Sequence, residues 1–311
     1  MAKVKKNNTT FRVTEPSNLA DFLLLKLGGA TRNRIKGLLA HRLIMVNQSV
    51  QTRADYALKA GDTVVLIAGK GNTELHHPKL RILYEDNNFI VVEKKQGLLT
   101  VAANPKSAEE TVFSILKHYV KKQDIHNGIY VVHRLDRETS GVLLFVKTPQ
   151  LQEYMRTYWQ DLVRERVYIA LAEGVFSEPE GTIRTWLTED PQTGVSYSSP
   201  VDDGGKLSIT HYRVLKSINP STEHPVSLVE LSLETGRTNQ IRVHLASIGH
   251  PVVGDRKYGR GNTQQHQEAV KRGLLPDRLC LHAKRIAFIN PITEQPISFE
   301  AKGTNFGSMV K

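Results

Sequence analysis

The chain has 311 residues, 40% of them hydrophobic and 23% charged, so it is long enough for two or three domains and is neither disordered nor fibrous in composition. Lysine and arginine outnumber aspartate and glutamate by 42 to 31, and the net charge of +11 suits a polyanionic partner, with nucleic acid as the first candidate. Cys280 is the single cysteine, which excludes an internal disulfide framework and a thiolate zinc cluster and favours a reducing compartment.

The first sixteen residues, 1–16, are polar and basic, and they predict a flexible arm that could lie on phosphates. No apolar stretch has the length of a signal peptide or of a membrane span. We therefore expect a cytoplasmic protein with no membrane partner.

Residues 17–69 have the pattern of a small α/β module, in which helices come first and strands follow. A polar capping residue begins the first helix, and a pair of glycines ends it. The expected elements are helices over 18–28 and 31–40 and strands over 43–46 and 63–67. Residues 70–79 lack apolar periodicity, so we expect a linker and a domain boundary there.

Residues 80–311 have a different pattern, because short strand-like runs outnumber helical ones and the order is irregular. The expected strands are 89–92, 129–132, 142–146, 167–172, 209–215 and 228–233, and the expected helices are 111–121 and 151–159. This order favours an α+β fold with a mixed, largely antiparallel sheet over a doubly wound fold. We expect one domain over this range.

The run from His133 to Gly141 lies between two expected strands, so it is a loop at a sheet end, where functional side chains are common. His133, Arg134 and Arg137 can place positive charge around one carboxylate, Asp136. Such arginines favour the charged carboxylate and can also bind phosphate. On composition alone, the run can equally be a surface turn in which Asp136 caps a helix or pairs with Arg137.

The run His133 to Gly141, HRLDRETSG, resembles the catalytic signature of the RluA family of pseudouridine synthases. Other motifs of that family are matched in the expected order at 83–86, 166–170, 233–246, 249–255, 258–259 and 281–283. Several spaced motifs coincide over about residues 80–300, which makes the resemblance specific. It implies a pseudouridine-synthase catalytic domain, an isomerase that rotates uracil on its sugar.

The resemblance implies three catalytic residues. Asp136 starts cleavage of the glycosidic bond, by attack on the sugar or the base or by removal of a sugar proton, and the sequence leaves these routes open. Tyr168 lies against the uracil, with a role in removing the proton from carbon 5 also left open. Arg242 pairs with Asp136 and orients it. Without the resemblance, Tyr168 fits a core strand and Arg242 a helical arginine paired elsewhere.

RNA contacts are implied for the same loop. The target base must leave its stack to reach a carboxylate. Arg134 is the candidate to fill the vacated space, since its guanidinium can hydrogen-bond to neighbouring bases. His133, Arg137 and Thr139 are further candidate RNA contacts. Because uracil leaves and rejoins the same sugar, we expect no cofactor and no metal.

Three positions depart from the family pattern. Asn239 stands where histidine is frequent, Arg166 where lysine is usual, and Lys95 where proline commonly follows a lysine. The aspartate, tyrosine and arginine of the implied site are all present. We expect the departures to alter local RNA contacts more than activity.

The N-terminal module resembles the small S-four type RNA-binding domain over about residues 17–69. Its candidate RNA contacts, on or near the second expected helix, are Arg32, Arg34, Lys36 and Arg42. Together they can form one basic face for the phosphates of structured RNA. The alternative is an ordinary solvated, charged helix face.

The favoured function is isomerisation of uridine in structured RNA by a monomer, with large-subunit ribosomal RNA ahead of transfer RNA as substrate. The second hypothesis is an RNA-binding ribosome assembly factor or chaperone, motivated by the basic module and by Asn239. The third is a DNA-binding protein that reads DNA with its helix pair. The sequence does not predict which uridine is modified, because site choice depends on RNA shape.

Overall fold

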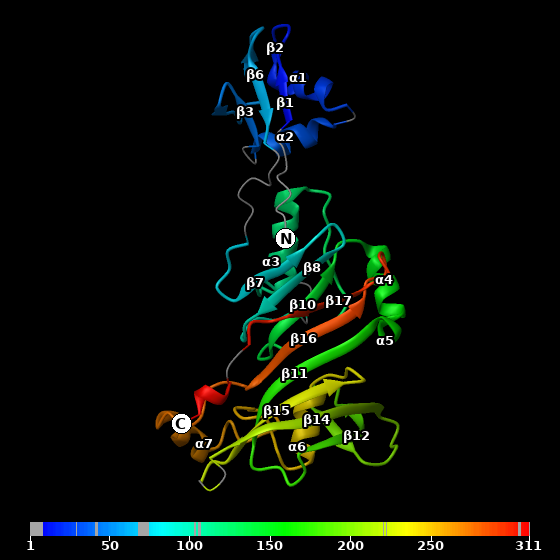
Figure 1. Cartoon of the computed structure of the whole chain (residues 1–311), viewed down its shortest axis with the longest axis vertical. Helices are drawn as coiled ribbons and strands as arrows, with labels where there is room; N and C mark the ends of the chain where they lie inside the picture. The colour runs from blue at the N-terminus through cyan, green and yellow to red at the C-terminus, as the bar shows by residue number, and fades with distance from the viewer. Residues whose placement is uncertain are drawn as a thin grey trace. The chain divides into compact units, whose positions relative to one another are not determined.

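The computed structural model describes residues 9–28, 30–40, 43–67, 75–102, 104, 107–219, 221, 223–303 and 306–310. The chain divides into two compact units (Figure 1). One holds Met1–Leu75 with Ser114–Ile129, and the other holds His76–Phe113 with Tyr130–Lys311. Within the described ranges, no helix is both long enough and apolar enough to cross a bilayer.

The N-terminal unit contains the two expected helices and several short strands. Its elements are β1 (Thr9–Arg12), β2 (Ser17–Asn18), α1 (Leu19–Lys26), α2 (Arg32–Ala40), β3 (Ile44–Val46), β4 (Ser49–Val50), β5 (Ala57–Leu58) and β6 (Thr63–Leu66). The sheet order is β1-β6-β3-β4, and β2 pairs with β5. Asn18 caps α1 by accepting the backbone N–H of Asp21 at 2.8 Å. Leu19, Leu23 and Ile35 are buried in the core of this unit.

The flexible arm expected over residues 1–16 is wrong for Thr9–Arg12, which form β1 against β6. Phe11 packs against the core of the unit, and its ring lies edge-to-face with Phe22 at a centroid distance of 6.4 Å. A single aromatic residue among polar neighbours is too weak a pattern to predict a strand. Residues 1–8 lie outside the described residues.

The second unit is built on one large sheet. The strand order is β13-β12-β14-β15-β11-β16-β10-β8-β7, with β17 beside β16 and β9 beside β10. Its strands are β7 (Leu80–Glu85), β8 (Phe89–Lys94), β9 (Tyr130–Val131), β10 (Ser140–Val146), β11 (Val163–Glu173), β12 (Glu180–Glu189), β13 (Ser196–Ser199), β14 (Lys206–Ile218), β15 (Val226–Leu233), β16 (Leu281–Ile289) and β17 (Pro296–Glu300). β10 and β16 run parallel and the other neighbours antiparallel. The predicted α+β class and mixed, largely antiparallel sheet are confirmed.

Two helices were predicted beyond residue 80, and the structure places α3 (Val112–Gln123) and α4 (Pro149–Thr157) at those positions. The remaining helical segments are α5 (Trp159–Leu162), α6 (Gln240–Ser247), α7 (Gln264–Lys271) and the 3₁₀ turn η1 (Phe306–Met309). α6 was missed because Gln240 and His244 are buried together with its apolar residues, so its sequence has no clean amphipathic stripe.

In the sheet, only β16 separates the start of β10 from β11. Gly141 of β10 pairs with Ala283 of β16, and Ala283 pairs in turn with Tyr168 of β11. Gly141 has a φ of 121°, and a Cβ atom there would lie 2.1 Å from the carbonyl oxygen of Ala283. Only glycine permits this approach. The loop that precedes β10 therefore ends one strand away from Tyr168, in the same row of paired residues.

Candidate active site

The loop between β9 and β10 carries Asp136 and is held by buried hydrogen bonds. The N–H of Thr139 donates to the carbonyl of Asp136 at 3.2 Å and closes a turn. The hydroxyl of Thr100 donates to the carbonyl of Leu135 at 2.7 Å and accepts the N–H of the same residue at 3.1 Å. Thr100 and Leu135 are both buried, so these bonds are shielded from water and fix the backbone beside Asp136.

Lys94 is a second support of this loop, and the sequence interpretation missed it. Its side chain is fully buried, and Nζ donates to the carbonyl of Arg137 at 2.9 Å. Burial lowers the pKa of Lys94 to about 7, against the attraction of Glu138 and Asp136. The side chain of a lysine at the end of an apolar strand usually reaches solvent, so the sequence pattern did not predict the burial of Lys94.

Asp136, Tyr168 and Arg242 line one cavity of about 70 Å³, which we call the catalytic cavity. Arg134 and Asn239 also line it, and Asp136 is the one carboxylate among its described lining residues. The side chain of Asp136 is 30% exposed, which leaves it open to a ligand in the cavity. The structure thus brings together, from a loop, a strand and a helix, the three residues that the resemblance assigns to catalysis.

Tyr168 is positioned by the centre of the sheet. It lies on β11, opposite Leu231 of β15 and Ala283 of β16. Burial raises the pKa of Tyr168 to about 12, although the charge of Arg166 opposes the shift. At neutral pH the side chain is therefore a protonated phenol, which can pack and donate a hydrogen bond but is a weak base.

Arg242, on α6, is held mainly by Asp255 and only secondarily faces Asp136. Its Nε and Nη2 atoms donate to the two carboxylate oxygens of Asp255 at 2.7 and 2.8 Å. The nearest distance from its Nη1 to an oxygen of Asp136 is 3.7 Å. Burial opposes the charge of Asp255, but the hydrogen bonds and charge of Arg242 outweigh it and lower the pKa of Asp255. The expected pairing with Asp136 is thus a charge contact, and Asp255 supplies the orientation.

Asn239 links Arg242 to a neighbouring tyrosine. Its Oδ1 accepts from Nη1 of Arg242 at 2.9 Å, and its Nδ2 donates to the hydroxyl of Tyr258 at 3.1 Å. The same hydroxyl accepts the N–H of Ser196 at 2.9 Å, and the ring of Tyr258 lies 5.1 Å from the guanidinium of Arg242. Asn239 adopts the left-handed conformation, with φ of 55°, that asparagine tolerates better than most residues. Asn239, which stands where the family pattern frequently has histidine, therefore contacts Arg242 directly.

Two of the candidate RNA contacts turn inward. Nε2 of His133 accepts the N–H of Leu144 at 2.9 Å, and the imidazole lies 5.3 Å from the ring of Trp159. Burial, with the charge of Arg166, lowers the pKa of His133 to about 3, so the ring is neutral. Thr139 is 3% exposed. His133, a potentially cationic residue type, is thus held as a neutral ring, and both side chains have structural surroundings that a short motif cannot reveal.

The two flanking arginines also have partners other than Asp136. Arg137 forms a bidentate ion pair with Glu109, in which its Nη2 donates to Oε2 of Glu109 at 3.1 Å. Arg134 is exposed at the rim of the catalytic cavity, and its Nη2 donates to the hydroxyl of Thr238 at 3.2 Å. Neither arginine forms an ion pair with Asp136 among the described residues, which corrects the expected ring of charge around it.

The basic residues expected in the N-terminal unit are found on one helix. Arg32, Arg34 and Lys36 are all exposed on α2. Arg42 lies outside the described residues, so its position is not part of this surface. Within the described ranges, no three His, Cys, Asp or Glu side chains are grouped to hold a metal ion.

Comparisons with known proteins identify the family of the chain. The family model for RNA pseudouridylate synthase matches residues 88–247, which include Asp136, Tyr168 and Arg242. A Bacillus subtilis protein named uncharacterized RNA pseudouridine synthase YhcT is 32% identical over 275 residues, covering 88% of this chain and 85% of that protein. Ribosomal large subunit pseudouridine synthase D of Nitrosomonas europaea is 32% identical over 307 residues, covering 96% and 86%.

A solved structure supports the same assignment. Human RNA pseudouridylate synthase domain containing 1 superposes with a TM-score of 0.57 at 25% sequence identity, covering 78% of this chain and 89% of that one. The match supports the α+β fold of the chain. The chain therefore belongs to the RNA pseudouridylate synthase family and is an RNA pseudouridine synthase of the RluA type.

Proposed function

We propose that the enzyme converts uridine to pseudouridine in large-subunit ribosomal RNA and that Asp136 starts the reaction. The observation that carries the mechanism is that Asp136 is the one carboxylate among the described residues of the catalytic cavity, opposite Tyr168 and within charge contact of Arg242. The name of the Nitrosomonas europaea relative, ribosomal large subunit pseudouridine synthase D, favours the ribosomal substrate over transfer RNA.

The chemistry requires no other reactant. The bond between N1 of uracil and C1′ of ribose breaks, a bond between C5 and C1′ forms, C5 loses its proton and N1 gains one. Asp136 starts the cleavage by attack on the sugar or the base or by removal of a sugar proton. Arg242, fixed by Asp255, keeps positive charge beside Asp136. Tyr168 packs against the uracil as a neutral phenol, which favours holding the base over removing its proton.

Access of the base calls for opening of the RNA stack. A uridine inside a helix or tight loop has to swing out before its glycosidic bond can reach a carboxylate. Arg134 lies exposed at the rim, with one nitrogen already anchored on Thr238. We assign it to the space that the base vacates, since a planar guanidinium can stack and hydrogen-bond there.

The N-terminal residues 17–69 complete the proposal as an S-four type RNA-binding domain, joined through residues 70–79 to a catalytic domain over residues 80–311. Arg32, Arg34 and Lys36 expose three cations on one helix, which suits the phosphates of structured RNA. The domain would add affinity without touching the reacting base.

Release of tritium from C5-labelled uridine tests the mechanism. Unmodified large-subunit ribosomal RNA transcribed in vitro is the first substrate, and transfer RNA is the second. Asp136→Asn should abolish release while RNA binding persists. The control Asp161→Asn changes an exposed aspartate outside the cavity and should behave as wild type.

Full activity of Asp136→Asn would overturn the mechanism, and release from transfer RNA alone would overturn the ribosomal substrate. Mapping of pseudouridine in cells with and without the gene separates the enzyme from an assembly factor. An assembly factor that only chaperones RNA leaves no modification missing.

A further inference from the structure

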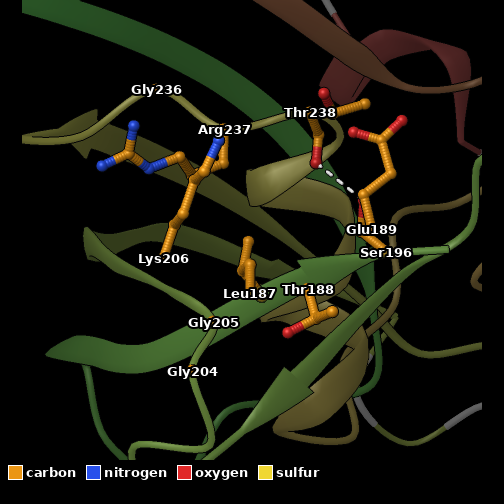
Figure 2. A pocket seen from close by; sticks show the side chains of 10 residues that line it. All are labelled: Leu187, Thr188, Glu189, Ser196, Gly204, Gly205, Lys206, Gly236, Arg237 and Thr238. Atoms are coloured by element: carbon orange, nitrogen blue, oxygen red, sulfur yellow. Dashed lines mark hydrogen bonds between the residues drawn. The ribbon is translucent and has the colours of Figure 1, made fainter. Parts of the chain in front are cut away.

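A larger cavity lies beside the catalytic cavity. It has a volume of about 400 Å³ and is lined by residues 187–189, Ser196, residues 204–206 and residues 236–238 (Figure 2). We call it the side pocket. Its size is in the range of pockets that hold small ligands, whereas the catalytic cavity measures about 70 Å³.

The two cavities share a wall. Arg237 lines both of them, and Thr238, which lines the side pocket, precedes Asn239 of the catalytic cavity. The hydroxyl of Thr238 also accepts the hydrogen bond from Arg134 at the catalytic rim. An RNA strand whose uridine enters the catalytic cavity therefore has a neighbouring nucleotide within reach of the side pocket.

The side pocket has two sides of opposite charge. Figure 2 shows the side chains of Lys206 and Arg237 close together on one side, Glu189 on the other and Leu187 between them. Within the described residues, none of these three charged side chains forms an ion pair. Two cations on the same side of the pocket, with no carboxylate partner among the described residues, favour an anion such as phosphate.

The opposite side suits the edge of a base. The carboxylate of Glu189 accepts hydrogen bonds and cannot donate them, so it favours a base that offers N–H donors. Guanine presents an amino group and a ring N–H side by side, while uracil presents one N–H between two carbonyls. Leu187, 5% exposed, gives the pocket an apolar floor on which a ring can rest.

Two glycines in the wall of the side pocket have no room for a side chain. A Cβ atom on Gly205 would lie 2.9 Å from Oγ1 of Thr188 and 3.1 Å from Cβ of Trp186. A Cβ atom on Gly236 would lie 2.5 Å from Nη1 of Arg166, whose Nη2 holds two backbone carbonyls of the adjoining strand end. At both positions a side chain would collide with neighbouring protein atoms, so packing of the pocket wall requires glycine.

The side pocket is also fastened to the catalytic arginine. The hydroxyl of Ser196 donates to the carbonyl of Thr238 at 3.2 Å, and the N–H of Ser196 donates to the hydroxyl of Tyr258. Tyr258 accepts from Asn239, and Asn239 accepts from Arg242. The distance between the two cavities is therefore set by hydrogen bonds rather than by a loose loop.

We propose that the side pocket binds the RNA nucleotide next to the target uridine, with its phosphate on Lys206 and Arg237 and an amino-bearing base, guanine foremost, against Glu189. Occupancy of the pocket places the adjacent uridine over Asp136 and so selects it. This inference rests on the proposed isomerisation of ribosomal RNA.

Single-turnover release of tritium from C5-labelled large-subunit ribosomal RNA, at increasing enzyme concentration, tests the proposal. Lys206→Ala should raise the half-saturating enzyme concentration about tenfold, far more than it lowers the maximal rate. Its slope of log affinity against log salt should be shallower by about 0.7. Glu189→Gln should also raise the half-saturating concentration, and pseudouridine mapping of its product should show additional uridines with other neighbours.

Matched controls come from the same unit. Lys216 lies on the same strand as Lys206 but outside the pocket, and Glu178 is an exposed glutamate outside it. Lys216→Ala and Glu178→Gln should behave as wild type. If wild type is active and Lys206→Ala and Glu189→Gln match these controls, the side pocket is not a nucleotide site. If wild type releases no tritium, the proposed function itself fails.

Discussion

Asp255 accepts two hydrogen bonds from Arg242, and this pair, rather than Asp136, orients the arginine of the catalytic cavity. The side chain of Asp255 is fully buried and that of Arg242 is 12% exposed. Removing one member of a buried pair leaves a desolvated charge, which is far more costly than losing a pair at the surface. Asp255 therefore supports both the fold and the site.

Asp255→Asn should lower the free energy of unfolding by about 3 kcal/mol and the single-turnover rate by about tenfold, because Arg242 loses its charged partner. Urea denaturation and tritium release measure the two effects. Asp277→Asn is the control, since it breaks an aspartate–arginine pair in which both side chains are more than half exposed. That change should stay within about 1 kcal/mol. Equal effects of the two substitutions would contradict the assignment.

Asn239 can be tested separately from its backbone conformation. Asn239→Gly keeps the left-handed backbone accessible but removes the bonds to Arg242 and Tyr258, and should slow turnover about threefold to tenfold. Asn239→Ala loses the same bonds and also strains the backbone, so it should cost about 1 kcal/mol more in stability. Comparable rates for the two variants, with different unfolding free energies, are expected. Full activity of Asn239→Gly would show that the side chain is not used.

The buried Lys94 should make the free energy of unfolding depend on pH. Its pKa is about 7 in the folded protein and near 10.5 when unfolded, so between these values the unfolded chain binds more protons. Stability from this group therefore rises with pH above 7, by up to about 1.4 kcal/mol per pH unit. Urea unfolding at pH 7, 8 and 9 should show the rise in wild type and a flatter profile in Lys94→Met.

The control for Lys94 is its neighbour. Lys95 is exposed and follows directly in the sequence, so Lys95→Met should keep the wild-type slope. A flat profile in the wild type would mean that Lys94 reaches water. Lys94→Met should also slow turnover, because the carbonyl of Arg137 loses its buried donor and the loop of Asp136 loosens.

The sequence predicted those features that depend on residues close together in the chain, and it did not predict contacts between more distant residues. Apolar runs gave β8 and β10, and the motif between strands gave the loop of Asp136, because these depend on neighbours in sequence. The resemblance brought Tyr168 and Arg242 to that loop. The partner of Arg242 was not predicted, since nothing in the spacing of thirteen residues to Asp255 distinguishes it from other carboxylates.

The burial of two titratable side chains was also not predicted from the sequence. His133 and Lys94 are titratable residue types, but burial lowers the pKa of both and so favours their neutral forms. Which polar residues end up inside depends on the packing of the whole sheet, and a short motif does not contain that information. The same limit applied to the buried Thr139.

Tyr168 should show no ionisation in the working pH range. With a pKa of about 12, its phenol stays protonated below pH 10, and we expect this neutral form to hold the base rather than to remove its proton. The single-turnover rate should therefore not rise in parallel with the small phenolate fraction between pH 7 and 9. Tritium release by wild type and by Tyr168→Phe, measured across that range, makes the comparison. A tenfold rise per pH unit in wild type that is absent from Tyr168→Phe would instead assign removal of the C5 proton to the phenolate.

The basic face of α2 should contribute affinity without chemistry. Replacing Arg32, Arg34 and Lys36 together by alanine removes three exposed cations, so the slope of log affinity against log salt should fall by about 2. The maximal single-turnover rate should change little, because these side chains belong to the N-terminal unit and do not line the catalytic cavity. Lys59→Ala, an exposed lysine of the same unit but not of α2, is the control. An unchanged salt slope in the triple variant would mean that α2 is an ordinary solvated helix and that the RNA is bound by the second unit alone.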